Sequence, residues 1–438
     1  MTTASTADAS PATISNSTKT RTRTAIVGSG IAGLTVAWRL RHDHQVTLFE
    51  AAPRLGGHTH THSVCVEGRD IAVDTGFIVY NDRNYPTLTR LFEELGITGH
   101  ATGMSFAVSC RRTGFEYNGG SIPGLLARRR NLLSPDFWRM VRDILRFNRE
   151  APALLQQPAP GPSLGEYLAQ AGFSAPFLSN YLLPMGAAIW SVPTAEMREF
   201  PAQRLVEFFA NHGLLSLSDR PQWYVVAGGS QRYVDAIVRG LPEPPRLATP
   251  VLGVRRDDDG AIIRTAAGSE RFDHVVFACH SNEALALLED PSPAEREILG
   301  AIRFQPNDVV LHTDTALMPR ARAAWAAWNY RLSEGDVEAT TVTYWMNRLQ
   351  HIDTPTQLLV TLNQTEDIRP ERVIARMRYS HPVFDGPAVA AQGRQDEISG
   401  ARHTWYCGAW WRYGFHEDGC QSGEAVAAGL LARTRASA

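Results

Sequence analysis

The chain has 438 residues, 44% of them hydrophobic and 20% charged, so it is long enough to bury the cores of two packed domains. A formal net charge of -2 gives no overall basic field and argues against nucleic acid as a partner. The five cysteines are scattered without a CxxC pair, and no run of about 18 apolar residues occurs, which argues against a disulfide framework, a zinc site or a membrane span. We therefore expect a reduced protein of the cytoplasm.

The first elements in the chain are a polar tail and a strand–turn–helix–strand unit. Residues 1–21 are rich in serine, threonine and alanine and lack the apolar stretch of a signal peptide, so we expect a disordered tail. An apolar run at 24–27 then leads into a glycine-rich turn at 28–33, helically spaced apolar residues at 34–41 and a second apolar run at 45–49. This order predicts a βαβ unit.

The rest of the chain alternates between the hydrophobic periods of strands and of helices. We expect strands at 64–67, 70–73, 246–255, 261–265, 272–278, 308–313, 340–345, 357–362 and 404–408, helices at 84–95, 135–149, 202–209 and 421–432, and a strand that turns into a helix within 225–237. Strands near both ends flank two less regular insertions. This favours an α/β fold with a discontinuous Rossmann-like domain and an interleaved α+β substrate domain of mixed sheet and helices. The predicted boundaries are 22–100, 225–290 and 395–438 for the Rossmann-like domain, and 101–224 and 291–394 for the substrate domain.

The turn at 28–33 carries a GxGxxG pattern in the context that a dinucleotide requires. Gly28 permits a tight turn after the strand, Gly30 lets backbone N–H groups approach a pyrophosphate, and Gly33 lets helix and strand pack closely. Glu50 follows at the end of the second strand, where an acid can accept hydrogen bonds from a ribose diol. The predicted cofactor contacts of this unit are Gly28, Ser29, Gly30, Ile31, Ala32, Gly33, Glu50 and Ala51.

The residues after Glu50 indicate a cofactor longer than NAD. The sequence continues with Arg54, a second diglycine at Gly56 and Gly57, and then His58. NAD does not need an arginine and a second close backbone approach directly after the ribose acid, whereas a longer dinucleotide does. We therefore expect FAD, and the discontinuous domain is predicted to be an FAD-binding domain.

At this point the chain resembles the flavin-containing amine oxidoreductase superfamily, which includes monoamine oxidases, protoporphyrinogen oxidase and phytoene desaturases. That superfamily continues the glycine pattern with E-x-x-x-R-x-G-G-R, a D-x-G and a Y-P, and this chain supplies Asp74-Thr75-Gly76 and Tyr85-Pro86 in order. It departs from the pattern at His58, where the family usually has arginine. The resemblance implies an adenine contact at Val251 and flavin contacts near the C-terminus. The cofactor residues implied in this way are Arg54, Gly56, Gly57, His58, Thr59, Thr75, Gly76, Phe77, Ile78, Val251, Gly408, Asp418, Gly419 and Cys420.

Alternating histidines at His58, His60 and His62 invite a metal interpretation, because alternate residues of a strand share one face. The segment lies inside the flavin pattern, directly after Gly57, and no nearby carboxylate or cysteine completes a ligand set. We therefore expect no metal and interpret the segment as backbone placed beside the cofactor.

Aromatic residues gather between 405 and 415, just before the segment that the resemblance places at the flavin. They can form an amine cage, sandwich a flat substrate or fill the core. His416 and Glu417 are the titratable groups nearest the expected ring, and either can act as a base or bond the backbone at a helix start. The candidate substrate-lining residues here are Trp410, Trp411 and Tyr413.

Two features favour a hydrocarbon substrate over an amine. The stretch 182–191 is apolar and uncharged, which suits a tunnel for a lipid-like chain, and its candidate lining residues are Met185, Ile189 and Trp190. Many amine-oxidising relatives hold a lysine near flavin N5, yet Lys19, in the polar tail, is the only lysine of this chain.

A narrower resemblance, carried by the segments 57–59, 73–81 and 414–419, is to bacterial predicted FAD/NAD-binding proteins associated with cyclopropane-fatty-acid-synthase-type methyltransferases. It implies desaturation of methylated fatty acyl chains in phospholipids, in which a base removes a proton and flavin N5 takes a hydride, with a lipid methyltransferase as partner. The alternatives are an FAD-dependent oxidase of an amine or another small molecule, and a non-catalytic flavoprotein within a lipid-modifying complex.

The segment 128–149 holds seven arginines and two aspartates around a predicted helix. Ser134 suits its N-cap, and Phe137, Val141, Ile144 and Leu145 form an apolar stripe. A basic helix with aromatic residues can bind an anionic surface on the inner face of the membrane, and it can equally pack on the core with a solvated arginine face.

Overall fold

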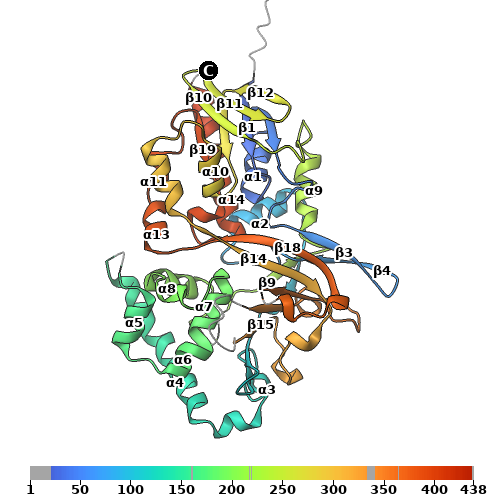
Figure 1. The fold of residues 1–438 in the computed structure, drawn as a ribbon, viewed down its shortest axis with the longest axis vertical. Coiled ribbons are helices and arrows are strands. Elements are labelled where there is room, and N and C mark those ends of the chain that lie inside the picture. The colour runs from blue at the N-terminus through green and yellow to red at the C-terminus, as the bar shows by residue number, and fades with distance from the viewer. Residues whose placement is uncertain are drawn as a thin grey trace, which may run out of the picture.

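The computed structural model describes residues 21–158, 161–216, 218, 220–332, 341–363 and 365–436. The predicted tail therefore lies, apart from Arg21, outside the described residues. The molecule is elongated, with a parallel sheet towards one end and a group of helices at the other (Figure 1).

Four parallel strands form the sheet at one end, in the order β19-β13-β1-β2. The central strand β1 pairs with both neighbours, so that Thr24 lies opposite His274 on one side and Val46 on the other. Its apolar residues are almost fully buried, as expected for a parallel strand covered on both faces. The bounds of the strands are β1 Arg23–Val27, β2 Gln45–Phe49, β13 His274–Phe277 and β19 Thr404–Tyr406.

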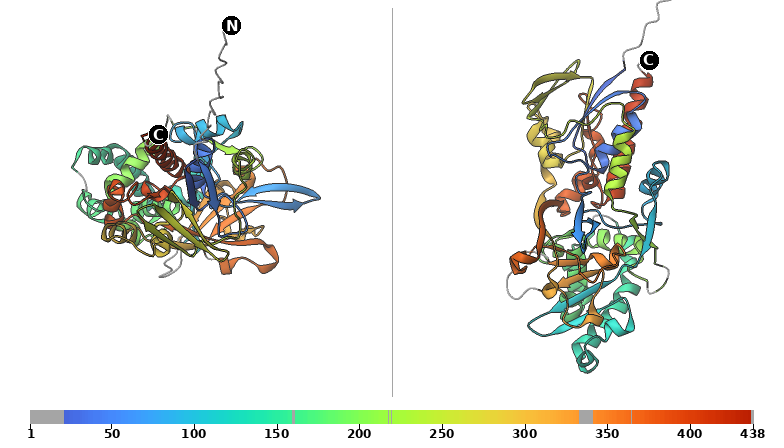
Figure 2. Two further views of the ribbon diagram at one scale, coloured as in Figure 1. Left: turned by 90° about the horizontal axis from the view of Figure 1, so that it is seen from above. Right: turned by 90° about the vertical axis from the view of Figure 1, so that its right-hand side faces the viewer.

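Different layers cover the two faces of this sheet. Successive side chains of β1 point to opposite faces, so neighbouring residues of the strand pack against different layers. Ile26 packs in one apolar cluster with helices α1 and α14, which lie side by side in Figure 2. Ala25 and Val27 face a second cluster with the antiparallel sheet β10-β11-β12 and helices α10 and α11. These elements are α1 Ile31–Leu40, α14 His416–Ala436, β10 Gly253–Asp257, β11 Gly260–Thr265, β12 Gly268–Phe272, α10 Ser281–Leu287 and α11 Pro293–Ala301.

A hairpin and a small three-stranded sheet connect the two ends of the molecule. The hairpin of β3 and β4 projects from the body in the left view of Figure 2. The small sheet has the order β5-β9-β6, so residues near position 80 pair with residues near 224. The bounds are β3 Thr61–Val66, β4 Arg69–Asp74, β5 Tyr80–Asn81, β6 Gly99–Thr102, β9 Trp223–Val226, α2 Pro86–Glu94 and α9 Gln231–Arg239.

A seven-stranded mixed sheet dominates the other end, in the order β18-β14-β17-β16-β15-β7-β8. Strands far apart in the chain meet here, since β7 pairs in parallel with β15. The bounds are β7 Phe106–Cys110, β8 Phe115–Asn118, β14 Phe304–His312, β15 Trp328–Arg331, β16 Val342–Trp345, β17 Leu359–Leu362 and β18 Val373–Pro382.

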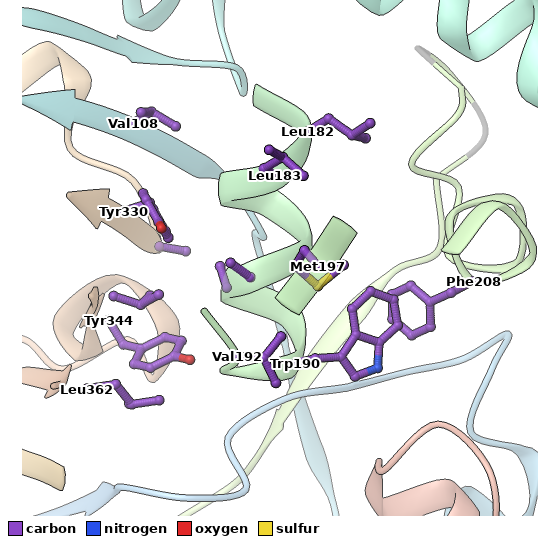
Figure 3. Packing of buried hydrophobic residues seen from close by; sticks show 14 of the residues in the cluster. Val108, Leu182, Leu183, Trp190, Val192, Met197, Phe208, Tyr330, Tyr344 and Leu362 are labelled. Carbon is purple, nitrogen blue, oxygen red and sulfur yellow. The ribbon is translucent and has the colours of Figure 1, made fainter. Parts of the chain in front are cut away.

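Helices pack against this sheet through a large apolar cluster. Figure 3 shows Val108, Tyr330 and Tyr344 from the sheet facing Leu183 and neighbouring side chains of the helices. The cluster is the core of this end of the molecule. The helices here are α3 Ile122–Leu125, α4 Pro135–Glu150, α5 Leu164–Ala171, α6 Ala175–Phe177, α7 Leu183–Trp190, α8 Ala202–Asn211 and α12 Met346–Leu349. Helix α13, Gly386–Gln392, packs instead on α11, in the cluster beneath the parallel sheet.

Three sequence predictions need correction. The strand expected at 246–255 begins only at Gly253, because Ala248 adopts a φ of 47° and Pro250 has no N–H to donate to a ladder. The last helix begins at His416, five residues before the expected start. Leu145, expected on the buried stripe of α4, is 50% exposed, whereas the buried positions are Phe137, Met140, Asp143 and Phe147.

Candidate functional site

The three glycines of the first turn have different surroundings. Gly28 has a φ of 105°, and a Cβ there would lie 2.9 Å from the carbonyl oxygen of Ala278. A Cβ on Gly33 would overlap the carbonyl oxygen of Gly28, so both glycines are required for packing. A Cβ on Gly30 would meet nothing within 4 Å. Gly30 is therefore dispensable for the fold, and the open space above it is available to a ligand.

Helix α1 begins at this open space, and no side chain of the described residues caps its first turn. Its N-cap, Gly30, supplies no side-chain hydrogen bond, and the first turn contains no acidic residue. The leading N–H groups of a helix need an acceptor, and together with the helix dipole they favour an anion. The N-terminus of α1 fits a phosphate group.

Glu50 stands at the end of β2, beside the same turn. Its carboxylate accepts hydrogen bonds from the backbone N–H and the hydroxyl of Ser29, at 3.0 and 2.5 Å, and from the N–H of Ala52 at 2.8 Å. These bonds fix the half-buried side chain while leaving lone pairs of a carboxylate for further donors. This is the position expected for the acid that binds a ribose diol. Ala51, the remaining residue predicted for this unit, follows directly and is exposed.

The loop after Glu50 folds onto the start of α1. The Arg54 guanidinium donates to the carbonyl oxygens of Gly57 and Thr59, at 2.7 and 3.0 Å, and so shapes the loop rather than extending along a cofactor. The N–H of Gly56 donates to the carbonyl oxygen of Ser29 at 3.0 Å. A Cβ on Gly57 would lie 3.0 Å from the Cα of Gly30. The second diglycine thus lets two backbone segments meet at the phosphate-binding turn.

The Asp74–Ile78 segment is bonded to this loop. Asp74 is buried and accepts hydrogen bonds from Thr61 and Ser230, and burial raises its pKa to about 6. A Cβ on Gly76 would overlap the carbonyl oxygen of His58, and the N–H of Phe77 donates to that oxygen at 2.9 Å. The hydroxyl of Thr75 donates to the His60 carbonyl oxygen at 3.1 Å, and Ile78 is buried in the large apolar cluster.

The C-terminal residues of the predicted cofactor site lie against α1. A Cβ on Gly419 would lie 2.7 Å from the Cγ2 of Ile31, and one on Gly423 would lie 2.6 Å from the carbonyl oxygen of Ala32. Helices α1 and α14 therefore approach closely. Among the remaining residues of this group, the N–H of Gly408 donates to the Ser422 hydroxyl, and Asp418 accepts a hydrogen bond from the N–H of Phe415. Cys420 is buried beside Thr35, and Val251 packs beneath β1 and β2.

These observations together test whether a dinucleotide fits. Four features meet at the C-terminal ends of β1 and β2. They are a helix N-terminus without a side-chain cap, a glycine whose Cβ would meet no atom, an acid at the end of the second strand, and a second glycine loop. This is where ligands bind in open parallel sheets. The residues present fit the adenosine and pyrophosphate half of FAD.

The two predicted catalytic residues do not have the environment of a base. Both oxygens of Glu417 accept backbone hydrogen bonds at the start of α2, from Thr87 at 3.0 Å and Leu88 at 2.9 Å. Glu417 caps a helix whose own N-cap residue makes no side-chain bond. His416 stacks on Phe77 with ring centroids 3.7 Å apart, and its Nε2 lies 2.9 Å from the Thr59 hydroxyl oxygen, so this nitrogen already has a hydrogen-bond partner within the protein. The structure thus argues against both as the proton acceptor.

The aromatic residues before α14 fall into two groups. Trp410 and Trp411 are buried, stack on each other and pack in the cluster beneath the parallel sheet, and the Trp410 indole N–H donates to the Cys279 carbonyl oxygen. They belong to the core, so their predicted role in lining a substrate site was wrong. Tyr413 is half-buried and packs on the other apolar cluster, where its carbonyl oxygen accepts from the indole N–H of Trp190 at 3.2 Å.

Helix α7 presents the predicted hydrocarbon-binding residues. Met185 and Ile189, one turn apart, are half-buried, whereas Trp190 is buried against Phe200 and Phe208. No charged residue occurs from 178 to 195. The half-exposed face of α7 is therefore apolar.

A histidine cluster that the sequence analysis missed adjoins the cofactor loop. The ring of His58 lies 5.2 Å from that of His381 and 6.2 Å from that of His280, and its buried Nε2 has no hydrogen-bond partner among the described residues. The amide of Asn307 donates to Nδ1 of His381 at 3.0 Å, so the His381 proton is on Nε2. Burial and the neighbouring imidazoles lower the pKa of His58 well below its usual value. For His381 burial and His280 lower the pKa to about 4.

The alternating histidines do not converge as metal ligands. His60 and His62 lie close, with ring centroids 4.0 Å apart, and His60 bonds the Tyr379 hydroxyl, whereas His58 packs against His381 and His280. Within residues 21–436, outside the gaps given above, no group of three potential ligand side chains is arranged for a metal, and no helix is long and apolar enough to cross a membrane.

Solved structures of several flavoenzymes share this fold. A putative protoporphyrinogen oxidase from Exiguobacterium is 17% identical, with a TM-score of 0.69, over 94% of this chain and 99% of its own. A cofactor-binding mutant of putrescine oxidase is 16% identical, with a TM-score of 0.68, over 94% and 99%. A fatty acid isomerase from P. acnes is 17% identical, with a TM-score of 0.65, over 94% and 98%. At these identities the likeness concerns the fold.

The family itself is established by a match along most of the sequence. The model of the flavin containing amine oxidoreductases matches residues 31–431, which include helix α1, the Arg54–Gly57 loop and the start of α14. The geometry of the cofactor site agrees with that match. The chain therefore belongs to the flavin containing amine oxidoreductase family and is an FAD-dependent oxidoreductase.

Proposed function

We propose that this oxidoreductase desaturates acyl chains of phospholipids, methylated chains among them. The observation that carries the proposal is the apolar face of α7, where Met185 and Ile189 are half-buried in a segment without charged residues. A face of this kind suits a hydrocarbon chain and offers nothing to a cation. A lipid methyltransferase is the kind of partner that would supply the methylated chains.

Desaturation removes a hydride from one carbon and a proton from its neighbour, leaving a double bond. FAD, when bound, supplies the two-electron acceptor for the hydride. The proton needs an acceptor from this chain, and His58 is the member of the histidine cluster whose buried Nε2 lacks a partner among the described residues. We propose His58 for this role, because burial beside His381 and His280 keeps its imidazole uncharged, and only an uncharged imidazole can accept a proton.

Oxidation of an amine is the second candidate function, and one observation favours it. The hydroxyl of Tyr413 donates to the Glu207 carboxylate, next to the stacked rings of Phe208 and Phe415. Aromatic rings with a nearby carboxylate are groups that bind an organic cation. However, the guanidinium of Arg204 lies over the Tyr413 ring, 4.4 Å from its centroid, and occupies the ring face that a cation would need.

The test is mass spectrometry of phospholipids after incubation with the FAD-loaded protein and a dye as electron acceptor. We expect methylated acyl chains to lose two hydrogen atoms. Ile189→Glu, which places a carboxylate on the apolar face of α7, should abolish this change while FAD stays bound. Leu247→Glu is the matched control, because Leu247 is exposed and lies between α9 and β10, away from α7. Unchanged lipids together with turnover of an amine panel would favour the second candidate.

A further inference from the structure

Large exposed hydrophobic residues concentrate in one short part of the chain. Nine such residues occur in the described structure, and six of them lie between positions 122 and 155. Ile122 is 75% exposed, Leu133 86% and Trp138 47%. An exposed apolar patch on an otherwise polar surface marks a binding site for a protein or a membrane. The six residues are Ile122, Leu132, Leu133, Trp138, Leu145 and Leu155.

These residues lie in or beside the helices α3 and α4, which are at the end of the molecule remote from the parallel sheet (Figure 1). Ile122 begins α3, and Leu133 ends the 3-10 turn η1, Arg129–Leu133, which leads into α4. The indole N–H of Trp138 donates to the Leu132 carbonyl oxygen at 2.9 Å and ties the first turn of α4 to η1. Trp138 and Leu145 then share one face of α4, with Arg142 between them.

The charges around this patch are mainly positive. From Arg128 to Glu150 seven arginines face three carboxylates. Several of them are engaged internally, since Arg128 pairs with Glu116 at 3.3 Å and Arg146 donates to the Ala171 carbonyl oxygen at 2.8 Å. Arg129 is exposed, and Arg142, although 3.7 Å from the Asp143 carboxylate, keeps a 74% exposed side chain, so these two interleave with the apolar residues.

We propose that Ile122, Arg129, Leu133, Trp138, Arg142 and Leu145, here called the docking face, bind the surface of an anionic phospholipid bilayer. Apolar side chains enter the bilayer interface while guanidinium groups meet lipid phosphates. The occupant follows from charge complementarity, because the guanidinium groups beside the apolar side chains match the negative phosphates of an anionic bilayer. Next to α4, a surface depression of about 600 Å³ is lined by Arg142, Ser179 and Asn180, and by Arg139, which pairs there with the Asp136 carboxylate at 3.0 Å. The inference deepens the proposed function and rests on it for the nature of the lipid.

The experiment is co-sedimentation of the FAD-loaded protein with phosphatidylglycerol vesicles and with phosphatidylcholine vesicles. We expect binding to the anionic vesicles that weakens with salt, and a loss of about tenfold or more in the partition coefficient for Leu133→Ser/Trp138→Ser. Arg129→Ser/Arg142→Ser should weaken binding to anionic vesicles alone. Leu247→Ser/Leu252→Ser, which removes exposed leucines elsewhere, is the matched control and should bind as the wild type does.

Unaltered binding of both docking-face variants, or equal binding to the two kinds of vesicle at all salt concentrations, would overturn the proposal. Flavin content and melting temperature verify that each variant is folded. Activity on detergent-dispersed phospholipid separates the two claims. A protein that ignores vesicles yet desaturates dispersed lipid contradicts the docking face alone. A protein that binds vesicles but leaves all lipids unchanged supports the docking face and contradicts the proposed function.

Discussion

The substitution Gly30→Ala should weaken binding of the cofactor while leaving the stability of the fold unchanged. The backbone of Gly30 has a φ of -66°, which alanine adopts without strain, and its Cβ would meet nothing within 4 Å. The apoprotein should therefore melt at the wild-type temperature. The added methyl group occupies the space through which a pyrophosphate reaches the first amides of α1.

The expected loss follows from the bonds that the methyl group obstructs. A hydrogen bond to a charged group contributes about 1.5–3 kcal/mol, and displacement of the phosphate lengthens or breaks about two of them. FAD affinity should fall by about 3–6 kcal/mol, or roughly 10²- to 10⁴-fold. Gly30→Val should lie at the upper end.

Isothermal titration of FAD into apoprotein measures the loss, and the melting temperature of each apoprotein measures the fold. Gly386→Ala is the matched control, because a Cβ there also meets nothing within 4 Å and Gly386 lies in α13, apart from the glycine turn. Gly33→Ala provides the contrast, since its Cβ overlaps the Gly28 carbonyl oxygen and should destabilise the apoprotein itself. Wild-type FAD affinity in Gly30→Ala would refute the assignment of the phosphate site.

Three further predictions concern single side chains. Glu417→Ala should lower the free energy of unfolding by about 1–2 kcal/mol through loss of the α2 cap, and the pH profile of activity should not move. Buried His312 accepts a hydrogen bond from the Asp314 N–H, and burial lowers its pKa from 6.5 to about 4. The contribution of His312 to the free energy of unfolding should therefore be constant above pH 6.5 and fall by about 3 kcal/mol as the pH drops to 4. Thermal melts of His312→Gln should lack this part of the loss. Stopped-flow mixing of the reduced holoenzyme with O₂ should show slow reoxidation, because the described residues contain no lysine, and rapid reoxidation would revive the oxidase hypothesis.

The sequence predicted the parts of the site that are contiguous in the chain. Gly28, Gly30, Gly33 and Glu50 lie within one βαβ unit, where a local pattern fixes both the turn and the strand end that carry them. The strands of the parallel sheet were also predicted, because buried parallel strands are short apolar runs. The order of these strands in the sheet, with β19 at the edge beside β13, could not be predicted from the sequence and was known only from the structure.

Long-range contacts account for the predictions that the structure corrected. For Glu417 the sequence left open a base or a bond to the backbone at a helix start, and the structure shows the second, with amides 330 and 329 residues away in the chain. Trp410 and Trp411 were interpreted as a substrate surface, and nothing local reveals that they pack beneath the parallel sheet. The cluster of His58, His280 and His381 draws on three distant segments, so no spacing in the sequence announces it. The available signals were His58, which directly follows Gly57, and His280, which stands shortly after the end of β13.

Anaerobic spectroscopy of the bound flavin tests the central claim most directly. The FAD-loaded protein is mixed without oxygen with phospholipid vesicles that carry methylated acyl chains, and separately with a panel of primary amines. The account predicts that the oxidised-flavin absorbance bleaches with the lipid and that Ile189→Glu abolishes the bleaching. Bleaching by an amine, with the lipid inert in both vesicle and detergent form, would contradict it.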